Sequence, residues 1–349
     1  MEQREFESSQ LPAEAIRRTV FQGPNALEQY LNSANHIVPL VELDREELNP
    51  FIKDGVRIFA KQETALPLNQ VKFITADQIL GAMKKRGEFD GVHTLVESSS
   101  GNMALAFRVV ARVVHGIEQC YSLVPPDIPV AKLNQLRVAG IHVIITEGNG
   151  IEIAKELGKK KGWVNPAQYG NPDNPNAHYV ITGPQIWQQM DGRIDMFVAG
   201  LGTTGTFIGA GTYLKEQNPD IHRVAVVVAE NSNVPGVRSL ERLKPIEFDW
   251  RSVSDSIQYV TGPDASKTCA VLISYGFLNG SSSGLALRGV WQELQQLCNE
   301  KKLKLRHNGE LRVATILPDP ATPYIERIIS DMDGCCVPPA LHDADISNL

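Results

Sequence analysis

One stretch decides the fold of this chain: Phe197-Val198-Ala199-Gly200-Leu201-Gly202-Thr203-Thr204-Gly205-Thr206. The mainly apolar run 194–199 predicts a buried strand, and residues 207–215 predict a helix after the glycine- and threonine-rich loop. Such a loop suits an anion, because free backbone N–H groups and the positive end of the helix dipole point toward it. It is not a Walker loop, because no Lys-Ser or Lys-Thr pair follows. A tight turn whose glycines serve packing alone is the alternative.

Strands and helices alternate on both sides of this stretch. The other predicted strands are 36–41, 56–61, 94–97, 119–124, 142–145, 222–229, 256–260 and the closing strand 312–317. The other predicted helices are 26–31, 75–85, 102–115, 128–139, 151–160, 183–189, 266–275 and 283–298. Repeated β-α units with short connections favour an α/β fold with doubly wound parallel sheets. There are more β-α units than one sheet would hold, so we expect two such domains with the active site in the cleft between them.

Composition narrows the class of protein. The 349 residues are 42% hydrophobic and 21% charged, as is typical of a globular protein with a large core. A net charge of −6 argues against nucleic acid or an anionic membrane as the main partner. The first residues are too polar for a signal peptide, and no apolar run approaches the roughly 18 residues of a membrane helix. We therefore expect a soluble, cytoplasmic protein.

The cysteines are widely spaced and lack metal-type Cys-x-x-Cys pairs: Cys120, Cys269, Cys298, Cys335 and Cys336. This pattern predicts free thiols in a reducing compartment and no metal site. The adjacent Cys335-Cys336 pair falls in residues 331–349, whose prolines and aspartates are typical of a disordered tail. A redox-active role for this pair is the alternative to plain thiols.

Three further loops carry polar side chains next to predicted strands or helices. Residues 98–102, Ser-Ser-Ser-Gly-Asn, offer hydroxyls, N–H groups and an amide to a carboxylate. Residues 280–284, Gly-Ser-Ser-Ser-Gly, repeat the pattern, and ordinary serine caps explain both loops equally well. The third loop ends at Lys72, where a cation at a predicted helix start opposes the dipole. A Schiff base with an aldehyde cofactor would use this amine, and a plain surface lysine is the alternative.

In this order the four loops resemble one enzyme family. The patterns are Lys-x-Glu-x-x-x-Pro-x-x-x-x-Lys at 61–72, Ser-Gly-Asn at 100–102, Gly-x-Gly-Thr-x-Gly-Thr at 200–206 and Gly-x-Ser-Ser-Gly at 280–284. The chain looks like the fold-type II pyridoxal-phosphate enzymes of the cysteine synthase and cystathionine beta-synthase family. The resemblance runs from about residue 36 to residue 328.

The resemblance implies a cofactor, pyridoxal 5′-phosphate, and a role for each loop. Lys72 would form the Schiff base and later move the Cα proton. Asn102 would hydrogen-bond the 3′-hydroxyl of the cofactor, and Ser282 would face its pyridine nitrogen. The phosphate would be bound by the glycine-threonine loop, that is, by Gly202, Thr203, Thr204, Gly205 and Thr206. The substrate carboxylate would be bound by Ser99, Ser100, Asn102, Met103 and Gln168.

The implied reaction is β-replacement on O-phospho- or O-acetyl-L-serine through an aminoacrylate, which a neutral Ser282 hydroxyl at the ring nitrogen would favour. Residues 97–102, 168–179 and 203–206 are similar to synthases that join O-phospho-L-serine to L-glutamate, giving N-(2-amino-2-carboxyethyl)-L-glutamate, a diaminopropionate precursor. An amine nucleophile such as L-glutamate is therefore favoured. The alternatives are a cysteine synthase using sulfide or another thiol, and a binding protein that kept the fold but lost turnover.

The sequence also departs from the family pattern. Residues 70–74, Gln-Val-Lys-Phe-Ile, replace the usual Ser-x-Lys-Asp-Arg, and Met103 replaces a frequent threonine. Arg238 and Arg242 are candidates to recognise a second substrate, with plain surface charge as the alternative. The resemblance further implies a homodimer with small amino acids as substrates.

By the same resemblance we expect a larger cofactor-phosphate domain from residues 1–75 and 180–330. Residues 76–179 would form a smaller, mobile domain, and residues 331–349 a tail.

Overall fold

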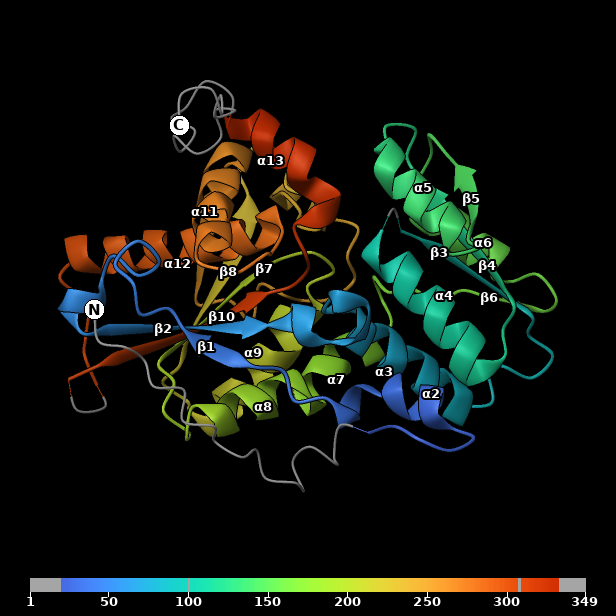
Figure 1. Cartoon of the computed structure of the whole chain (residues 1–349), viewed down its shortest axis with the longest axis horizontal. Coiled ribbons are helices and arrows are strands. Elements are labelled where there is room, and N and C mark those ends of the chain that lie inside the picture. Colours follow the sequence, from blue (N-terminus) through green and yellow to red (C-terminus); the bar gives the residue numbers. More distant parts are fainter. Residues whose placement is uncertain (1–19, 100, 307–308, 333–349) are drawn as a thin grey trace, which may run out of the picture.

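The structure is a computed structural model that describes residues 20–99, 101–306 and 309–332 (Figure 1). Its strands form a six-stranded sheet, in the order β1-β2-β10-β7-β8-β9, and a four-stranded sheet, in the order β5-β4-β3-β6. The two sheets occupy opposite halves of the molecule in Figure 1. The predicted α/β fold with two parallel-sheet units is thereby confirmed.

The elements have the following bounds. The strands are β1 (Leu40–Glu42), β2 (Val56–Gln62), β3 (Thr94–Ser98), β4 (Gln119–Val124), β5 (His142–Ile145), β6 (Trp163–Val164), β7 (Met196–Gly200), β8 (His222–Val228), β9 (Ser256–Val260) and β10 (Leu311–Leu317). The α-helices are α2 (Ala26–Tyr30), α3 (Lys72–Lys85), α4 (Asn102–His115), α5 (Val130–Val138), α6 (Gly150–Leu157), α7 (Asp173–Val180), α8 (Thr182–Gln189), α9 (Gly205–Gln217), α10 (Leu240–Leu243), α11 (Gly262–Ser274), α12 (Ser281–Asn299) and α13 (Ile325–Met332). Short 3-10 helices are η1 (Ser33–Asn35), η2 (Ile52–Asp54), η3 (Glu63–Ala65), η4 (Pro67–Asn69) and η5 (Thr322–Tyr324).

Helices cover both faces of the six-stranded sheet. On one face, Val290 and Leu294 of α12 pack on strand residues such as Val226. On the other face, Phe207 of α9 stacks on Phe197 of β7, with ring centroids 6.3 Å apart. Each fully buried side chain of this size contributes roughly 1.5–3 kcal/mol to stability. Burial on both faces explains why the interior strand β7 and most of β8 are continuous apolar runs.

The four-stranded sheet is covered in the same way. Helices α3 and α4 lie side by side against one face and bury Phe73 and Phe107 completely (Figure 1). On the other face, Ala154 of α6 packs on Val96 and Leu123. The buried pattern of β3 and β4 therefore has the same cause as that of the larger sheet.

The structure differs from the prediction in the order and direction of two strands. Strand β1 is antiparallel to β2, so the six-stranded sheet is not wholly parallel. Strand β10 was expected to close the sheet, but it lies in the interior, parallel to both β2 and β7. Its position brings Pro318 and Asp319, which follow it, into the middle of the carboxyl edge of the sheet.

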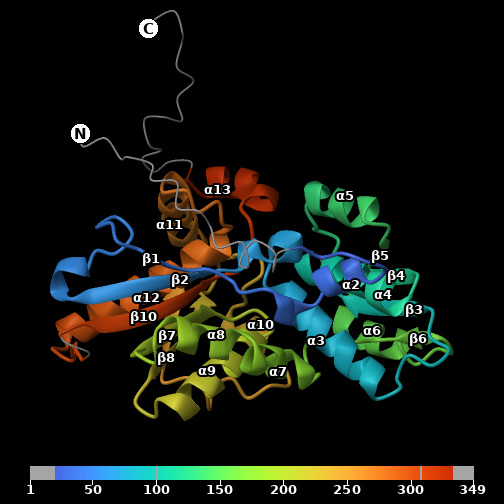
Figure 2. The ribbon, with the colours of Figure 1, turned by 60° about the horizontal axis from the view of Figure 1, so that its bottom comes forward.

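Several elements were missed. Strand β6 has two residues, too few for a periodic signal, and no helix was predicted at α7, whose asparagines and proline are unfavourable in helices. Helix α13 reaches into the predicted tail because Ile328 and Met332 pack against Cys269 of α11, as Figure 2 shows for the two helices. Residues 333–349, including the Cys335-Cys336 pair, lie outside the described residues.

The strands of the larger sheet come from the ranges 1–75 and 180–330, and those of the smaller sheet from 76–179. The domain boundaries and the mobility of the smaller unit stay predictions. Cys120, Cys269 and Cys298 are unpaired, as expected for the part of the chain that the structure covers. Among the described helices, none is both long enough and apolar enough to cross a membrane.

Candidate active site

The loops at the carboxyl ends of the parallel strands surround one cavity. It is lined by residues from both units of the fold: Val71, Lys72, Asn102, Ala199, Gly200, Gly202, Thr203, Thr204, Thr206, Gly236, Val237, Ser282, Ile316, Pro318 and Asp319. Ligands of doubly wound sheets bind at this edge. Four separate loops predicted from the sequence therefore meet in one place.

The glycine-threonine loop forms one end of this cavity, which we call the phosphate end (residues 202–206). Helix α9 begins at Gly205, and its N-cap residue Thr204 has a left-handed φ of 72°. A Cβ at Gly202 would lie 2.5 Å from the backbone oxygen of Gly236, so only glycine allows the two loops to approach. The buried Thr204 Oγ1 has no hydrogen-bond partner within the described structure. The first turn of α9 and this free hydroxyl fit a phosphate group.

Two buried side chains support the phosphate end from behind, and both lie on the missed helix α7. Asn174 Nδ2 donates to Thr203 Oγ1 at 3.0 Å, and His178 Nε2 lies 3.1 Å from Thr206 Oγ1. Burial, reinforced by the nearby Lys72, lowers the pKa of His178 to about 3. The imidazole is therefore neutral and positions Thr206 without adding charge.

Lys72 is the first residue of α3, as expected for a lysine at a helix start. Its Nζ donates to Thr203 Oγ1 at 3.4 Å, a weak contact that places the amine beside the phosphate end. Desolvation lowers the pKa of Lys72 to about 8; Arg238 acts in the same direction, and Asp319 opposes them. A larger fraction of neutral amine than an exposed lysine would have makes Lys72 a suitable nucleophile.

A second group of residues, which we call the carboxylate end, consists of Asn102, Ser282, Asp319 and Tyr324. Ser282 Oγ donates to Asp319 Oδ1 at 2.8 Å. Asn102 Nδ2 and the Tyr324 hydroxyl both donate to Asp319 Oδ2, each at 2.7 Å. Asp319 was not predicted as a site residue, because a Pro-Asp-Pro sequence after a strand is typical of a turn.

The predicted carboxylate-binding residues do not all line the cavity. Ser99 Oγ accepts from the backbone N–H of Ala104 at 3.2 Å, and Gln168 Nε2 donates to the Ser98 carbonyl at 3.0 Å. The side chain of Met103 packs in the apolar core beneath α4. Ser100 lies outside the described residues. The substrate roles assigned to these residues stay predictions.

Glu97 joins the two segments that carry these residues. Its carboxylate accepts from the backbone N–H groups of Ser98 at 2.8 Å and Gln168 at 3.1 Å. Burial raises the pKa of Glu97 to about 7, although these hydrogen bonds act in the opposite direction. Ser98 and Gln168 are therefore held by a titratable group, unlike the residues of the phosphate end.

Two cations lie beside the cavity. The Arg238 guanidinium is 4.8 Å from the ring centroid of Tyr169, and Val237 lines the cavity. Lys132 of α5 lies 4.5 Å above the Tyr324 ring, and a Cβ at Gly101 would be 3.4 Å from its Nζ. Within the described residues, neither cation forms an ion pair with a carboxylate. The other candidate, Arg242, is exposed at the surface.

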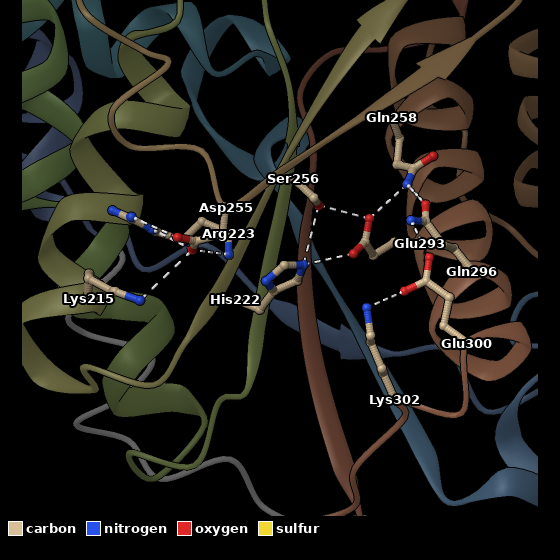
Figure 3. A network of polar contacts seen from close by, with 10 residues as sticks. All are labelled: Lys215, His222, Arg223, Asp255, Ser256, Gln258, Glu293, Gln296, Glu300 and Lys302. Atoms are coloured by element: carbon tan, nitrogen blue, oxygen red, sulfur yellow. Dashed lines mark hydrogen bonds and ion pairs between the residues drawn. The ribbon is translucent and has the colours of Figure 1, made fainter.

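A second polar cluster lies at the amino ends of β8 and β9, as Figure 3 shows. His222 Nε2 contacts Glu293 Oε1 at 2.7 Å and Ser256 Oγ at 3.3 Å, while Arg223 pairs with Asp255. Serine, histidine and glutamate are triad residue types, but both contacts use the same ring nitrogen. A catalytic triad needs one nitrogen for the nucleophile and the other for the acid. This cluster therefore links strands to α12 and is not a second active site.

The cavity fits pyridoxal phosphate on the observations above. It combines a phosphate cradle with a buried, unpartnered hydroxyl, a lysine whose pKa is lowered, and polar side chains for the ring substituents. Lys72, Asn102, Gly202, Thr203, Thr204, Thr206 and Ser282 line it together, whereas Gly205 is buried against Asn174.

Comparisons with known proteins agree with this fit. A family model described as pyridoxal-phosphate dependent enzyme matches residues 33–316. Cysteine synthase B of Salmonella typhimurium is 34% identical over 272 residues, 76% of this chain and 86% of that protein. An O-acetylserine dependent cystathionine beta-synthase from Helicobacter pylori superposes with a TM-score of 0.71 and 28% identity, over 84% of this chain and 97% of that one. The cysteine synthase of Entamoeba histolytica has a TM-score of 0.71 and 27% identity, over 84% and 88%.

The extent of these matches decides the family. The family model covers most of the chain, and the relatives align over most of their own length. The cofactor is pyridoxal phosphate, as the lysine and the phosphate end predict. The chain belongs to the pyridoxal-phosphate dependent enzymes and is a β-replacement enzyme of the cysteine synthase type.

Proposed function

We propose that this enzyme replaces the β-substituent of O-phospho- or O-acetyl-L-serine with an amine such as L-glutamate. The observation that carries the proposal is the pair of cations, Arg238 and Lys132, that flank the cavity without carboxylate partners in the described structure. Each is partly buried, so an anionic ligand would offset the cost of holding it there.

The two cations bear on which substrates fit. A phosphorylated serine carries one more negatively charged group than O-acetylserine. A dicarboxylic amino acid likewise carries one more than sulfide. Lys132 lies beside Gly101, in the predicted substrate-carboxylate loop, and Arg238 lies on Tyr169, next to the lining residue Val237. Charge-assisted hydrogen bonds to such groups are the strong ones, and they favour the anionic substrate pair.

Residues of the cavity would divide the work as follows. When bound, pyridoxal phosphate supplies an aldehyde and an electron-withdrawing ring, which together make the α-proton of an amino acid acidic. The phosphate end anchors the cofactor with backbone N–H groups and hydroxyls. Lys72 removes the proton at Cα and returns it after the nucleophile has added at Cβ. Ser99, Asn102 and Gln168 orient the substrate carboxylate, with the segments tied together by Glu97.

A cysteine synthase using sulfide or another thiol is the second candidate. Its support is the name of the curated relatives above 30% identity, which are cysteine synthases. Sulfide requires no cation beside the cavity, so this candidate leaves Arg238 and Lys132 without a role.

The test is a competition for one activated serine. The purified holoenzyme receives O-phospho-L-serine with equimolar L-glutamate, ammonia and sulfide, and the products are separated by mass spectrometry. The proposal expects N-(2-amino-2-carboxyethyl)-L-glutamate as the main product, and a repeat with O-acetyl-L-serine reports the leaving-group preference. Predominant cysteine would establish the second candidate instead. If neither serine changes the visible absorbance of the holoenzyme, β-replacement on serine is excluded.

The proposal includes the two-domain arrangement and the homodimer expected from the resemblance. Lys132 and Tyr324 bring α5 of the smaller unit against η5 of the larger one, so a contact of this kind would report closure. Small-angle scattering with and without O-phospho-L-serine measures closure, and light scattering after gel filtration measures the oligomeric state. Unchanged dimensions with substrate, or a monomeric mass, would contradict these two parts.

A further inference from the structure

Asn174, the second residue of α7, is fully buried and hydrogen-bonds to two different parts of the site. Its Nδ2 donates to Thr203 Oγ1 at 3.0 Å, at the phosphate end, and to the backbone carbonyl of Gln168 at 2.7 Å. A side-chain amide has two N–H donors, so these two bonds use both of them. One side chain therefore connects the phosphate end with a residue that we expect to bind the substrate carboxylate.

The surroundings of Asn174 restrict the position of its amide. The side chain lies against the first turn of α9, where a Cβ at Gly205 would be 2.0 Å from Asn174 Oδ1. The carbonyl of Gln168 can only accept a hydrogen bond, so the nitrogen of the amide must face it. Moving the amide away from Gln168 or Thr203 would leave a buried polar group without its partner, which is costly.

At the phosphate end, the contact with Asn174 determines what the Thr203 hydroxyl can do. A hydroxyl has one O–H donor and two acceptor positions. Thr203 Oγ1 accepts from Asn174 Nδ2 at 3.0 Å and, more weakly, from Lys72 Nζ at 3.4 Å. Both acceptor positions are then in use, and Thr203 lines the cavity. The hydroxyl proton is therefore left to donate to an oxygen of a bound phosphate.

On the substrate side, Gln168 is held by its backbone as well as by its side chain. Its N–H donates to Glu97 Oε2 at 3.1 Å, and its carbonyl accepts from Asn174. One of the two N–H groups of its side chain donates to the Ser98 carbonyl at 3.0 Å. Within the described residues the other N–H has no acceptor, so it can donate to a substrate carboxylate.

We infer that Asn174 couples the two sides of the site, so that a phosphate at Thr203 and a carboxylate at Gln168 each strengthen the binding of the other. Both ligands need the same position of the Asn174 amide, and the ligand that binds first holds it there for the second. Asn174 does not itself line the cavity, so it is a positioning residue that acts through Thr203 and Gln168. The inference rests on the carboxylate role proposed above for Gln168, and not on the identity of the nucleophile.

The test measures this coupling as a change in cofactor affinity. The holoenzyme is dialysed to equilibrium against a series of pyridoxal phosphate concentrations, with sodium propionate or with sodium chloride at the same concentration. Propionate carries a carboxylate but no amine, so it cannot react with the aldehyde of the cofactor. In the native enzyme we expect propionate to lower the Kd of pyridoxal phosphate about fivefold or more, a typical coupling between two sites. In Asn174→Ala the two Kd values should agree within about twofold, because the connection is lost.

Asn176→Ala is the matched control, because Asn176 is exposed on the same helix, and it should keep the native coupling. Thr203→Val keeps Asn174 but removes the hydroxyl that it positions, so it should abolish the coupling as Asn174→Ala does.

The native holoenzyme alone can decide the question. Equal Kd values with propionate and with chloride in the native enzyme overturn the inference, even if Asn174→Ala does not fold. Coupling that persists in Asn174→Ala or in Thr203→Val overturns it as well, and Asn174 would then serve stability only. Because neither an activated serine nor a nucleophile is present, failure of the glutamate reaction leaves these outcomes unchanged.

Discussion

The two ends of the cavity hold their ligand groups by different chemistry. The phosphate end uses backbone N–H groups, hydroxyls and the neutral His178, none of which titrates near neutral pH. The carboxylate end is organised around the buried Asp319 side chain, and the neighbouring substrate loop around Glu97, whose pKa burial raises to about 7. The phosphate end therefore keeps the same charge across the neutral pH range, whereas Glu97, beside the substrate loop, changes its charge near neutral pH.

The largest expected effect comes from the residue between the two ends. Lys72→Ala removes the amine that contacts Thr203 and is influenced by Asp319. Loss of a positioned acid–base group typically costs 10²–10⁴-fold in rate, so product formation should fall by about that factor or more. The visible absorbance of the holoenzyme should change as well, while the phosphate end still binds the cofactor.

Lys84→Ala is the matched control, because Lys84 lies exposed near the end of the same helix. It should retain activity within twofold, by the rule that exposed substitutions change little. Activity of Lys72→Ala close to that of Lys84→Ala would remove Lys72 from the mechanism.

The next-largest effect tests the titration of Glu97, which the phosphate end does not share. Burial raises the pKa of Glu97 from 4.5 to about 7, so the folded state keeps a proton that the unfolded state loses. Stability therefore falls as pH rises from 4.5 to about 7, and stays at the lower level above that. At about 1.4 kcal/mol per unit of pKa, the decline is on the order of 3 kcal/mol. Glu97→Gln should remove it, as measured by urea unfolding at a series of pH values.

Glu28→Gln is the control for this experiment, because Glu28 is exposed on α2. Its stability should follow pH as the native protein does. If Glu97→Gln shows the same pH dependence as the native protein, Glu97 does not carry its proton in the folded state.

A smaller effect tests the rigidity of the phosphate end. In Gly202→Ala the new Cβ would lie 2.5 Å from the backbone oxygen of Gly236, and backbone cannot yield as a side chain can. Overpacking of this kind typically costs about 1–3 kcal/mol, and cofactor affinity should fall with it. Urea unfolding and equilibrium dialysis of pyridoxal phosphate measure the two quantities.

Gly81→Ala supplies a control of opposite sign. A Cβ at Gly81, within α3, meets nothing within 4 Å, so alanine should stabilise the helix by roughly 0.5–1 kcal/mol. Equal tolerance of both substitutions would mean that the two loops do not need their close approach.

The same contrast explains how much of the structure could be predicted from the sequence. The phosphate end is one continuous loop, so its residues can be recognised together in the sequence. The bounds of α4, β4, β5 and β9 were also predicted correctly, because glycine or turn residues end them; α4, for example, stops at Gly116 with a φ of 67°. Local signals of this kind are read within a few residues.

Groups that depend on packing could not be predicted in this way. Asp319 becomes a site residue only because β10 lies inside the sheet, and His178 because α7 packs behind α9. Lys61 of the recognised motif is completely buried and donates to the Val38 carbonyl, away from the cavity. Phe73 and Ile74, which replace polar residues of the family pattern, pack in the core. Each of these facts depends on contacts between residues far apart in the chain.

The smallest effect concerns substrate choice by Arg238, beside the cavity. Arg238 is partly buried on Tyr169, whereas Arg242 is exposed four residues later. Arg238→Ala should raise the KM for L-glutamate roughly tenfold, since a hydrogen bond to a charged group contributes about 1.5 kcal/mol or more. Its kcat should change little, because binding to a remote carboxylate acts on substrate and transition state alike.

Arg242→Ala is the matched control and should leave both constants unchanged, which steady-state kinetics with varied L-glutamate can establish. High salt should weaken the Arg238 effect, because partly exposed charges are screened. If the KM for L-glutamate is unaffected by Arg238→Ala, this cation does not bind the nucleophile. Selection of the amine would then depend on Lys132 or on the size of the cavity.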